Sequence, residues 1–168
     1  MSTRYPTATL ALAVVAAALS GCALVPEPSP TPTAVFASEE EAFAAAEEVY
    51  RSYNEAGNQG RDVTTFLVGR ALEGELDTIR YLNQNKLTLD GPSEITSFKG
   101  TKVSGDDATQ TIHSSLCLDV SATRVLDVDG ADVTPSDRAE KMKLEVTFSF
   151  VDDELLISDS VTSEDQSC

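Results

Sequence analysis

The stretch TIHSSLCLDV, residues 111–120, decides the fold that this chain is expected to adopt. Its apolar residues recur at every second position, and a period of two is typical of a β-strand buried on one face. One face collects Ile112, Ser114, Leu116, Leu118 and Val120, and the other collects Thr111, His113, Ser115, Cys117 and Asp119. The stretch therefore predicts a half-buried strand whose apolar face excludes Cys117.

Similar patterns lie on both sides of this strand. Residues 95–103 follow Gly91-Pro92 and alternate with a slip that indicates a β-bulge. Residues 125–133 contain Asp129-Gly130, which is a hairpin turn signal. Residues 144–150 alternate without a slip, and a turn at Asp152-Asp153 leads to a last strand that contains Leu155, Ile157 and Val161. These segments predict an antiparallel sheet.

Helical patterns come before the strands. Residues 38–41 read SEEE, a capping box in which Ser38 accepts from a backbone amide and Glu41 reaches back. The apolar stripe of the predicted helix consists of Phe43, Ala46, Tyr50 and Tyr53, at spacings of three and four, and Gly57 and Gly60 end it.

A second helical region starts near Asp62, a plausible N-cap. Gly69 and Gly74 weaken it, so the sequence favours a short helix, a break and a second helix to about Asn85. Its apolar residues are Val63, Phe66, Leu67, Leu72, Leu76, Ile79 and Leu82.

Helices followed by antiparallel strands predict an α+β fold with the N-terminal helices on one face of a curved sheet. The stretches SEEEAFAAAEEVYRSY, ITSFKG and LCLDVSATRV, in this order of elements, resemble the NTF2-like (cystatin-like, α+β cone) domains of actinobacterial lipoproteins. The resemblance covers most of residues 38–168. It implies a conical domain with a pocket between helices and sheet, and no particular activity, because the fold hosts enzymes and adaptors alike.

Residues 1–21 have the pattern of a secretory signal peptide. Arg4 precedes the ten apolar residues Leu10–Leu19, and small residues follow. As a helix, Thr7 to Leu19 would cover roughly 20 Å, whereas a bilayer core is about 30 Å thick. The alternative, a buried N-terminal helix, lacks an amphipathic pattern.

Leu19-Ser20-Gly21-Cys22 resembles the lipobox of bacterial lipoproteins. The resemblance implies cleavage between Gly21 and Cys22 and a diacylglycerol on the Cys22 sulfur, and it leaves N-acylation of Cys22 open. Two acyl chains anchor a protein stably. The expected location is therefore the extracytoplasmic face of the cell membrane.

Residues 22–37 form a proline-rich linker in this interpretation. Proline at positions 26, 28, 30 and 32 favours an extended spacer. All 28 acidic residues follow Cys22, and loss of Arg4 from the 12 basic residues gives a formal charge of about −17. This charge argues against nucleic-acid partners and against adhesion to anionic lipid head groups.

The cysteine count supports lipidation of Cys22. Three cysteines leave one thiol unpaired in an exported protein, and lipid on Cys22 would leave the even pair Cys117 and Cys168. An oxidising compartment preserves disulfides, so a Cys117–Cys168 bond is expected. The alternative is two independent buried thiols.

No motif in the sequence identifies a catalytic residue, a metal site or a cofactor. His113 is the single histidine, and its strand neighbours Ser115 and Asp119 diverge rather than converge as a triad does. Residues 127–138 lack the glycine and glutamate of an EF-hand loop, so a hairpin with solvated carboxylates is expected.

The leading hypothesis is a non-enzymatic, membrane-anchored lipoprotein that binds a small apolar ligand or an envelope protein. The expected pocket lining is apolar and consists of Leu116, Leu118, Leu144, Val146 and Phe148. A rival hypothesis, an envelope hydrolase or isomerase, needs an inward carboxylate, for which Asp119 or Glu145 would have to face the pocket. A third hypothesis is a purely structural spacer.

Overall fold

The computed structural model describes residues 36–105, 109–165 and 167–168 of the chain. The predicted signal peptide, the lipidation site Cys22 and nearly all of the linker lie outside the described residues. The elements follow one another as α1 (Glu39–Asn58), the 3₁₀ turn η1 (Thr64–Phe66), α2 (Gly69–Asn85), β1 (Thr88–Asp90), β2 (Glu94–Ser104), β3 (Thr111–Asp119), β4 (Arg124–Leu126), β5 (Lys141–Val151) and β6 (Glu154–Thr162).

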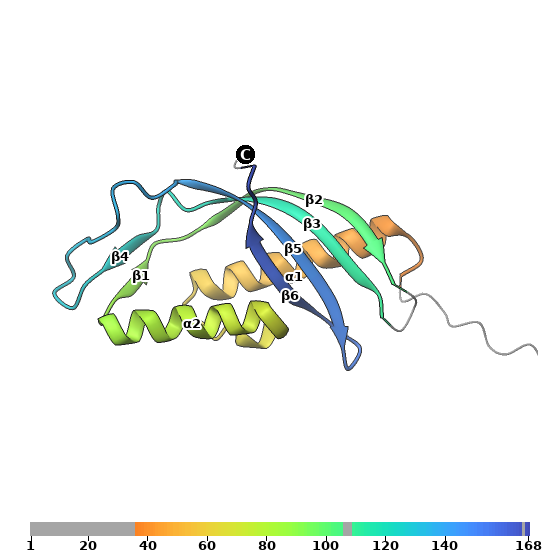
Figure 1. The fold of residues 1–168 in the computed structure, drawn as a ribbon, viewed down its shortest axis with the longest axis horizontal. Coiled ribbons are helices and arrows are strands. Elements are labelled where there is room, and N and C mark those ends of the chain that lie inside the picture. The colour runs from red at the N-terminus through yellow and green to blue at the C-terminus, as the bar shows by residue number, and fades with distance from the viewer. Residues whose placement is uncertain (1–35, 106–108, 166) are drawn as a thin grey trace, which may run out of the picture. The chain divides into compact units, whose positions relative to one another are not determined.

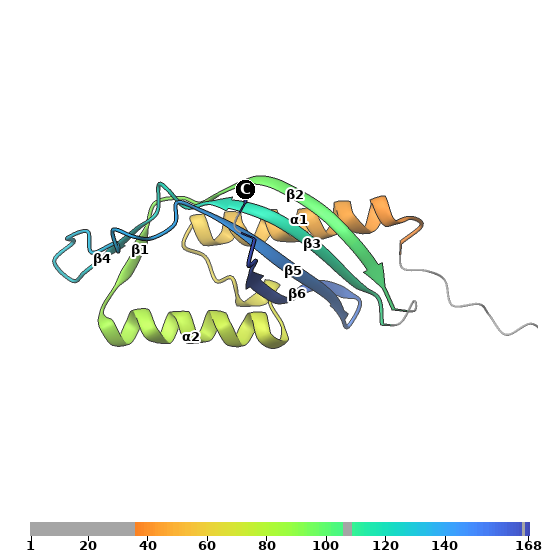
Figure 2. The same ribbon diagram turned by 45° about the horizontal axis from the view of Figure 1, so that its top comes forward.

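The architecture is the predicted α+β fold. Four antiparallel strands pair in the order β2-β3-β5-β6, and a separate two-stranded sheet pairs β1 with β4. Figures 1 and 2 show α1 and α2 on the same side of the curved four-stranded sheet. An antiparallel sheet tolerates this arrangement because its other face can remain in water.

The core forms where the alternating faces of β3 and β5 meet α1. Ile112 and Phe148 are fully buried, and Leu116 and Val146 are 1% exposed, as the period of two predicts. Ser114 lies on the same face at 1% exposure, and its hydroxyl has no hydrogen-bond partner among the described residues. The sheet is therefore held by one apolar layer.

The N-terminus of α1 is capped as predicted, with one difference. The Ser38 hydroxyl accepts a hydrogen bond from the Glu41 amide at 3.2 Å. The Glu41 carboxylate accepts from the amide of Ala37 at 2.7 Å, one residue before the position of a regular capping box. The first bond satisfies an amide that a helix start leaves free, and the second ties the residue before the N-cap to the first turn.

Contact between α1 and β2 depends on a glycine. A Cβ atom built on Gly100 would lie 2.0 Å from Cγ of Phe43, so only glycine lets this ring lie against the strand. Gly100 pairs with Ser114 of β3, which places two small residues side by side under the helix. The predicted β-bulge is also present, because the β2–β3 register shifts between Ile95 and Ser97 and again between Gly100 and Lys102.

The second helical region breaks as predicted, at Leu67 and Val68, which are extended. The Val68 amide donates to the Ile157 carbonyl of β6 at 2.9 Å. The extended residues between the two helices therefore pair with β6, through a parallel bridge between Leu67 and Ile157. Gly74 does not interrupt α2. No residue of α2 is buried, and Leu76 and Ile79 are 43% and 37% exposed.

Two features depart from the sequence pattern. The β5–β6 register shifts between Thr147 and Phe148, and beyond this shift Val161 turns outward and is 41% exposed. Strand β1 was not predicted, because three residues are too few to show a period; its Leu89 pairs with Val125.

We expect Gly100→Ala to lower the free energy of unfolding by about 1–3 kcal/mol, because the new methyl group overlaps the Phe43 ring. Gly74→Ala is the control: its Cβ meets nothing within 4 Å, and alanine favours a helix by up to about 1 kcal/mol. Urea denaturation with the disulfide intact measures both. Equal stability of Gly100→Ala and wild type would show that Phe43 does not lie on Gly100.

Candidate functional site

A cavity of about 270 Å³ lies between α1, α2 and β6. This volume equals roughly nine water molecules at about 30 Å³ each. Its walls combine aromatic, aliphatic and polar groups, namely Tyr50, Tyr53, Leu67, Arg70, Ala71, Gly74, Glu75, Thr78, Ile157 and Ser160. The cavity exists because α2 leans on β6 without burying any of its own residues.

Glu75 is the carboxylate of this cavity. The Tyr53 hydroxyl donates to its Oε2 at 3.5 Å, a long hydrogen bond. Burial raises the pKa of the Glu75 carboxyl above its ordinary value, and the hydrogen bond from Tyr53 opposes this only in part. Burial, together with the negative charge of Glu75, raises the pKa of the Tyr53 hydroxyl to about 12. The pair therefore holds a half-buried acid beside a neutral phenol.

Tyr50 also contributes a hydroxyl group to the wall of the cavity. Its side chain belongs to the core and is only 3% exposed, and its ring centroid lies 5.6 Å from that of Tyr53. None of the described residues forms a hydrogen bond with the Tyr50 hydroxyl. Burial raises the pKa of this hydroxyl, so it remains a neutral donor and acceptor.

Arg70, the cation in the cavity lining, is paired with a carboxylate other than Glu75. Its guanidinium lies 3.3 Å from the Asp159 carboxylate on β6, and 73% of the Arg70 side chain is exposed. Such an exposed pair contributes little to stability. It does, however, place a compensating negative charge next to Arg70, and Glu75 has no cation partner among the described residues.

The lining predicted from the sequence is wrong. Leu116, Val146 and Phe148 do face inward, but they pack in the core under α1 and do not line the cavity. The cavity lies elsewhere, where α1, α2 and β6 meet.

The two carboxylates that the rival hypothesis required do not reach the cavity. Asp119 accepts from the Ser121 amide at 2.9 Å and lies 3.7 Å from the Lys141 ammonium, and these contacts hold its pKa below the ordinary value. Glu145 is exposed and pairs in register with Ser115 on β3.

Sequence reasoning missed Glu75, although a signal for it exists. Glu75 stands three residues after Leu72 and four before Ile79, on the apolar side of α2. A carboxylate inside an apolar stripe is unusual, and this spacing is the pattern that would have identified it.

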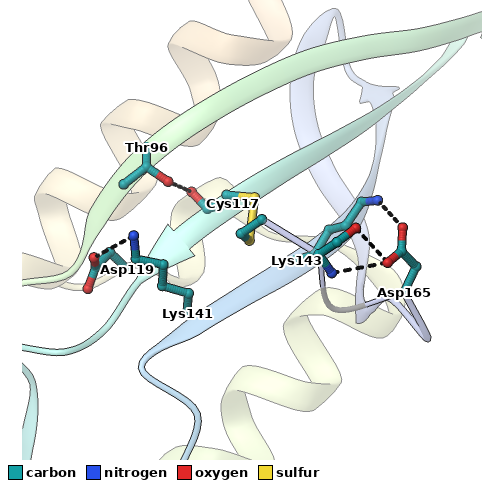
Figure 3. Close-up of a disulfide and its surroundings, with 8 residues drawn as sticks. Thr96, Cys117, Asp119, Lys141, Lys143 and Asp165 are labelled. Carbon is teal, nitrogen blue, oxygen red and sulfur yellow. Dashed lines mark hydrogen bonds and ion pairs between the residues drawn. A yellow bond between two sulfur atoms is a disulfide. The ribbon is translucent and has the colours of Figure 1, made fainter.

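Cys117 and Cys168 form a disulfide, the pairing that the cysteine count predicts (Figure 3). It ties Cys168 to the outer face of the sheet, and Cys117, although on that face, is only 8% exposed. Lys143 donates to Asp165 at 2.9 Å, and hydrogen bonds from Ser167 and Lys143 hold the pKa of Asp165 far below its usual range.

A groove of about 430 Å³ runs beside the disulfide, and its walls include Lys99, Lys143 and Glu145. In this groove Lys143 is already paired with Asp165 at 2.9 Å, whereas Glu75 of the cavity has no cation partner among the described residues. The groove is therefore a weaker candidate than the cavity beside Glu75.

His113 lies on the outer face of the sheet, as the alternation predicts. Its ring nitrogens lie 3.5 Å from the Ser104 hydroxyl and 3.3 Å from the Thr147 hydroxyl. No carboxylate accepts from its ring among the described residues, so the geometry is not that of a catalytic triad.

The loop after β4 is a turn held by its own carboxylate. Asp127 accepts from the amides of Asp129 and Ala131, each at 2.9 Å. No group of three His, Cys, Asp or Glu suited to a metal ion occurs within the described residues. Neither described helix is long and apolar enough to cross a bilayer.

The fold is shared with a solved structure. The intermembrane space region of the chloroplast protein ARC6 superposes on 71% of this chain and 95% of its own, with a TM-score of 0.51 and 15% identity. This likeness concerns the fold alone. No protein-family profile matches the chain, and a search of curated proteins finds no significant match.

The raised pKa of Glu75 predicts a pH-dependent cost in stability. The folded chain holds this proton more tightly than the unfolded chain, whose glutamate pKa is about 4.3. Stability is therefore lost as the pH rises from below that value through the higher folded pKa. We expect Glu75→Gln to match wild type near pH 3.5 and to have a higher Tm near pH 7.

Glu73→Gln is the matched control, because it removes the same charge from an exposed position on the same helix. Thermal unfolding of the three proteins across this pH range makes the comparison. A Glu75→Gln profile that coincides with that of Glu73→Gln would show that Glu75 is solvated like a surface residue.

Proposed function

We propose that this protein is a lipid-anchored, extracytoplasmic binding protein whose domain holds a small ligand in the cavity between α1, α2 and β6. The observation that carries the proposal is the cavity itself. Its lining combines the apolar side chains of Leu67, Ala71 and Ile157 with several hydrogen-bonding groups, and polar atoms form the larger part of its surface. A concave site that joins apolar side chains to placed polar groups is suited to binding a small molecule.

The size and lining limit the ligand. About 270 Å³ admits a short alkyl chain or a single aromatic ring with a small substituent. The sequence predicts a small apolar ligand or an envelope protein, but a purely apolar ligand would displace water from the half-buried Glu75 carboxylate and from the Tyr50 hydroxyl, at a cost in free energy. We therefore propose a ligand with an apolar body and one polar end.

The extracytoplasmic location is inferred from the N-terminal sequence. Leu19-Ser20-Gly21-Cys22 supports lipidation of Cys22, and the proline-rich residues 22–37 would act as a spacer. A disulfide at Cys117–Cys168 is consistent with an oxidising compartment. The strongly acidic domain would be repelled from anionic lipid surfaces, so the lipid would be its main attachment.

A second candidate function is an isomerase or hydrolase that uses Glu75 as its acid or base. The half-buried position of this carboxylate favours that option. The cavity lining contains no cysteine or histidine, and its serine, Ser160, has no neighbouring base in that lining. Binding without turnover is therefore the better-supported proposal.

Membrane attachment has a direct test. We expect the wild-type protein to enter the detergent-rich phase on detergent phase separation and Cys22→Ala to remain in the aqueous phase, because the acyl chains are absent. The double variant Cys117→Ser/Cys168→Ser is the control and keeps the wild-type distribution. Mature protein that starts before Cys22, or a Cys22→Ala variant that still enters the detergent phase, would refute lipidation.

Ligand binding can be tested by filling the cavity. A Cβ at Gly74 has nothing within 4 Å, so Gly74→Leu adds a side chain at the cavity wall without a backbone clash. Against a fragment panel of neutral, cationic and anionic compounds of this size, ligand-observed NMR should detect binding to wild type and Gly74→Ala. The Gly74→Leu variant should lose it. If no fragment binds in a Gly74-dependent manner, the cavity is not a ligand site.

A further inference from the structure

We propose that the cavity recognises a protonated amine on a small apolar body, with the ammonium group placed between the Glu75 carboxylate and the Tyr50 hydroxyl. This inference rests on the proposed function, because it names the chemical class of the ligand. It is carried by three observations: the charges in the wall, a tyrosine hydroxyl that is open to the cavity, and the two aromatic rings.

The charges in the cavity wall favour a cation. Of the two charged side chains there, Arg70 is paired with Asp159 at 3.3 Å, and Glu75 faces no cation among the described residues. A carboxylate in a partly desolvated site lacks the solvation that water would supply. A bound ammonium would supply the missing charge, whereas an anionic ligand would face Glu75 and Asp159 together.

The Tyr50 hydroxyl is the second observation. Tyr50 is 3% exposed and lines the cavity, no described residue hydrogen-bonds to its hydroxyl, and this oxygen is not among the fully buried atoms that lack a partner, so it is open to the cavity. The hydroxyl is therefore available to a ligand that enters the cavity. An ammonium group has three N–H donors, and the phenol oxygen of Tyr50 and the oxygens of Glu75 are acceptors.

The aromatic rings give the third observation. Tyr50 and Tyr53 both line the cavity, with centroids 5.6 Å apart and ring planes inclined at 55°. Aromatic faces attract cations, and the attraction is larger where water is excluded. The apolar side chains of Leu67, Ala71 and Ile157 in the lining would contact the apolar body of the ligand.

The titration of Glu75 agrees with this assignment. Burial disfavours its ionised form in the empty cavity, and an adjacent ammonium would favour that form. The affinity for an amine should therefore decrease as the pH falls through the Glu75 pKa. The other titratable groups that face the cavity or its mouth are Tyr50, Tyr53, Arg70 and Asp159, and the tyrosines stay neutral throughout that range.

The experiment compares three probes of nearly equal shape by isothermal titration calorimetry: phenethylamine, phenethyl alcohol and hydrocinnamate. We expect wild type to bind the amine at least about tenfold more tightly than the alcohol, and not to bind the carboxylate. Glu75→Gln should reduce the affinity for the amine about tenfold and leave that for the alcohol unchanged. Tyr50→Phe, which removes only the hydroxyl, should weaken amine binding by a smaller factor.

Glu73→Gln is the control and should bind all three probes as wild type does. Equal affinity of wild type for amine and alcohol, preference for the carboxylate, or full amine affinity in Glu75→Gln would each overturn the inference. In those cases the cavity would remain a ligand site of another class. If none of the three probes binds, and the Gly74-dependent fragment test also fails, the inference falls together with the proposed function.

Discussion

The structure depends on the burial of one face of the four-stranded sheet beneath α1. Phe148 and Ile112 are fully buried there, and each such side chain contributes roughly 1.5–3 kcal/mol. The helix approaches closely because it presents Ala42 and Ala46 to the sheet. Phe43 lies directly against Gly100, where any larger residue would overlap it. This contact sets how closely α1 approaches β2.

The cavity is a consequence of how the remaining strand is covered. The hydrogen bond from Val68 to Ile157 holds the start of α2 at β6, and α2 then runs beside the sheet without burying any residue. A tightly packed helix would have closed this space. Instead the Glu75 carboxylate lies there, and burial raises its pKa, a feature that is frequent at functional sites. The outer face, with the disulfide and the Lys143–Asp165 pair, fastens the end of the chain (Figure 3).

Most of the fold could be predicted because its signals are local. The alternation of residues 111–120 identifies β3, the SEEE motif places the start of α1, and the slip in residues 95–103 indicates the bulges of β2. The errors have physical causes. Val161 faces outward because the β6 register shift reverses the alternation beyond it, and β1 is too short to show a period.

The sequence by itself determined the α+β class, the order of the elements and which faces of β3 and β5 are apolar, because periodicity records one-sided burial within a single segment. It left open which element covers each face and how tightly. Only the tertiary structure decided that Leu116, Val146 and Phe148 belong to a packed core and that Glu75 lies in a cavity. The physical reason is that a cavity forms between elements distant in the chain, and its lining depends on where α2 meets β6.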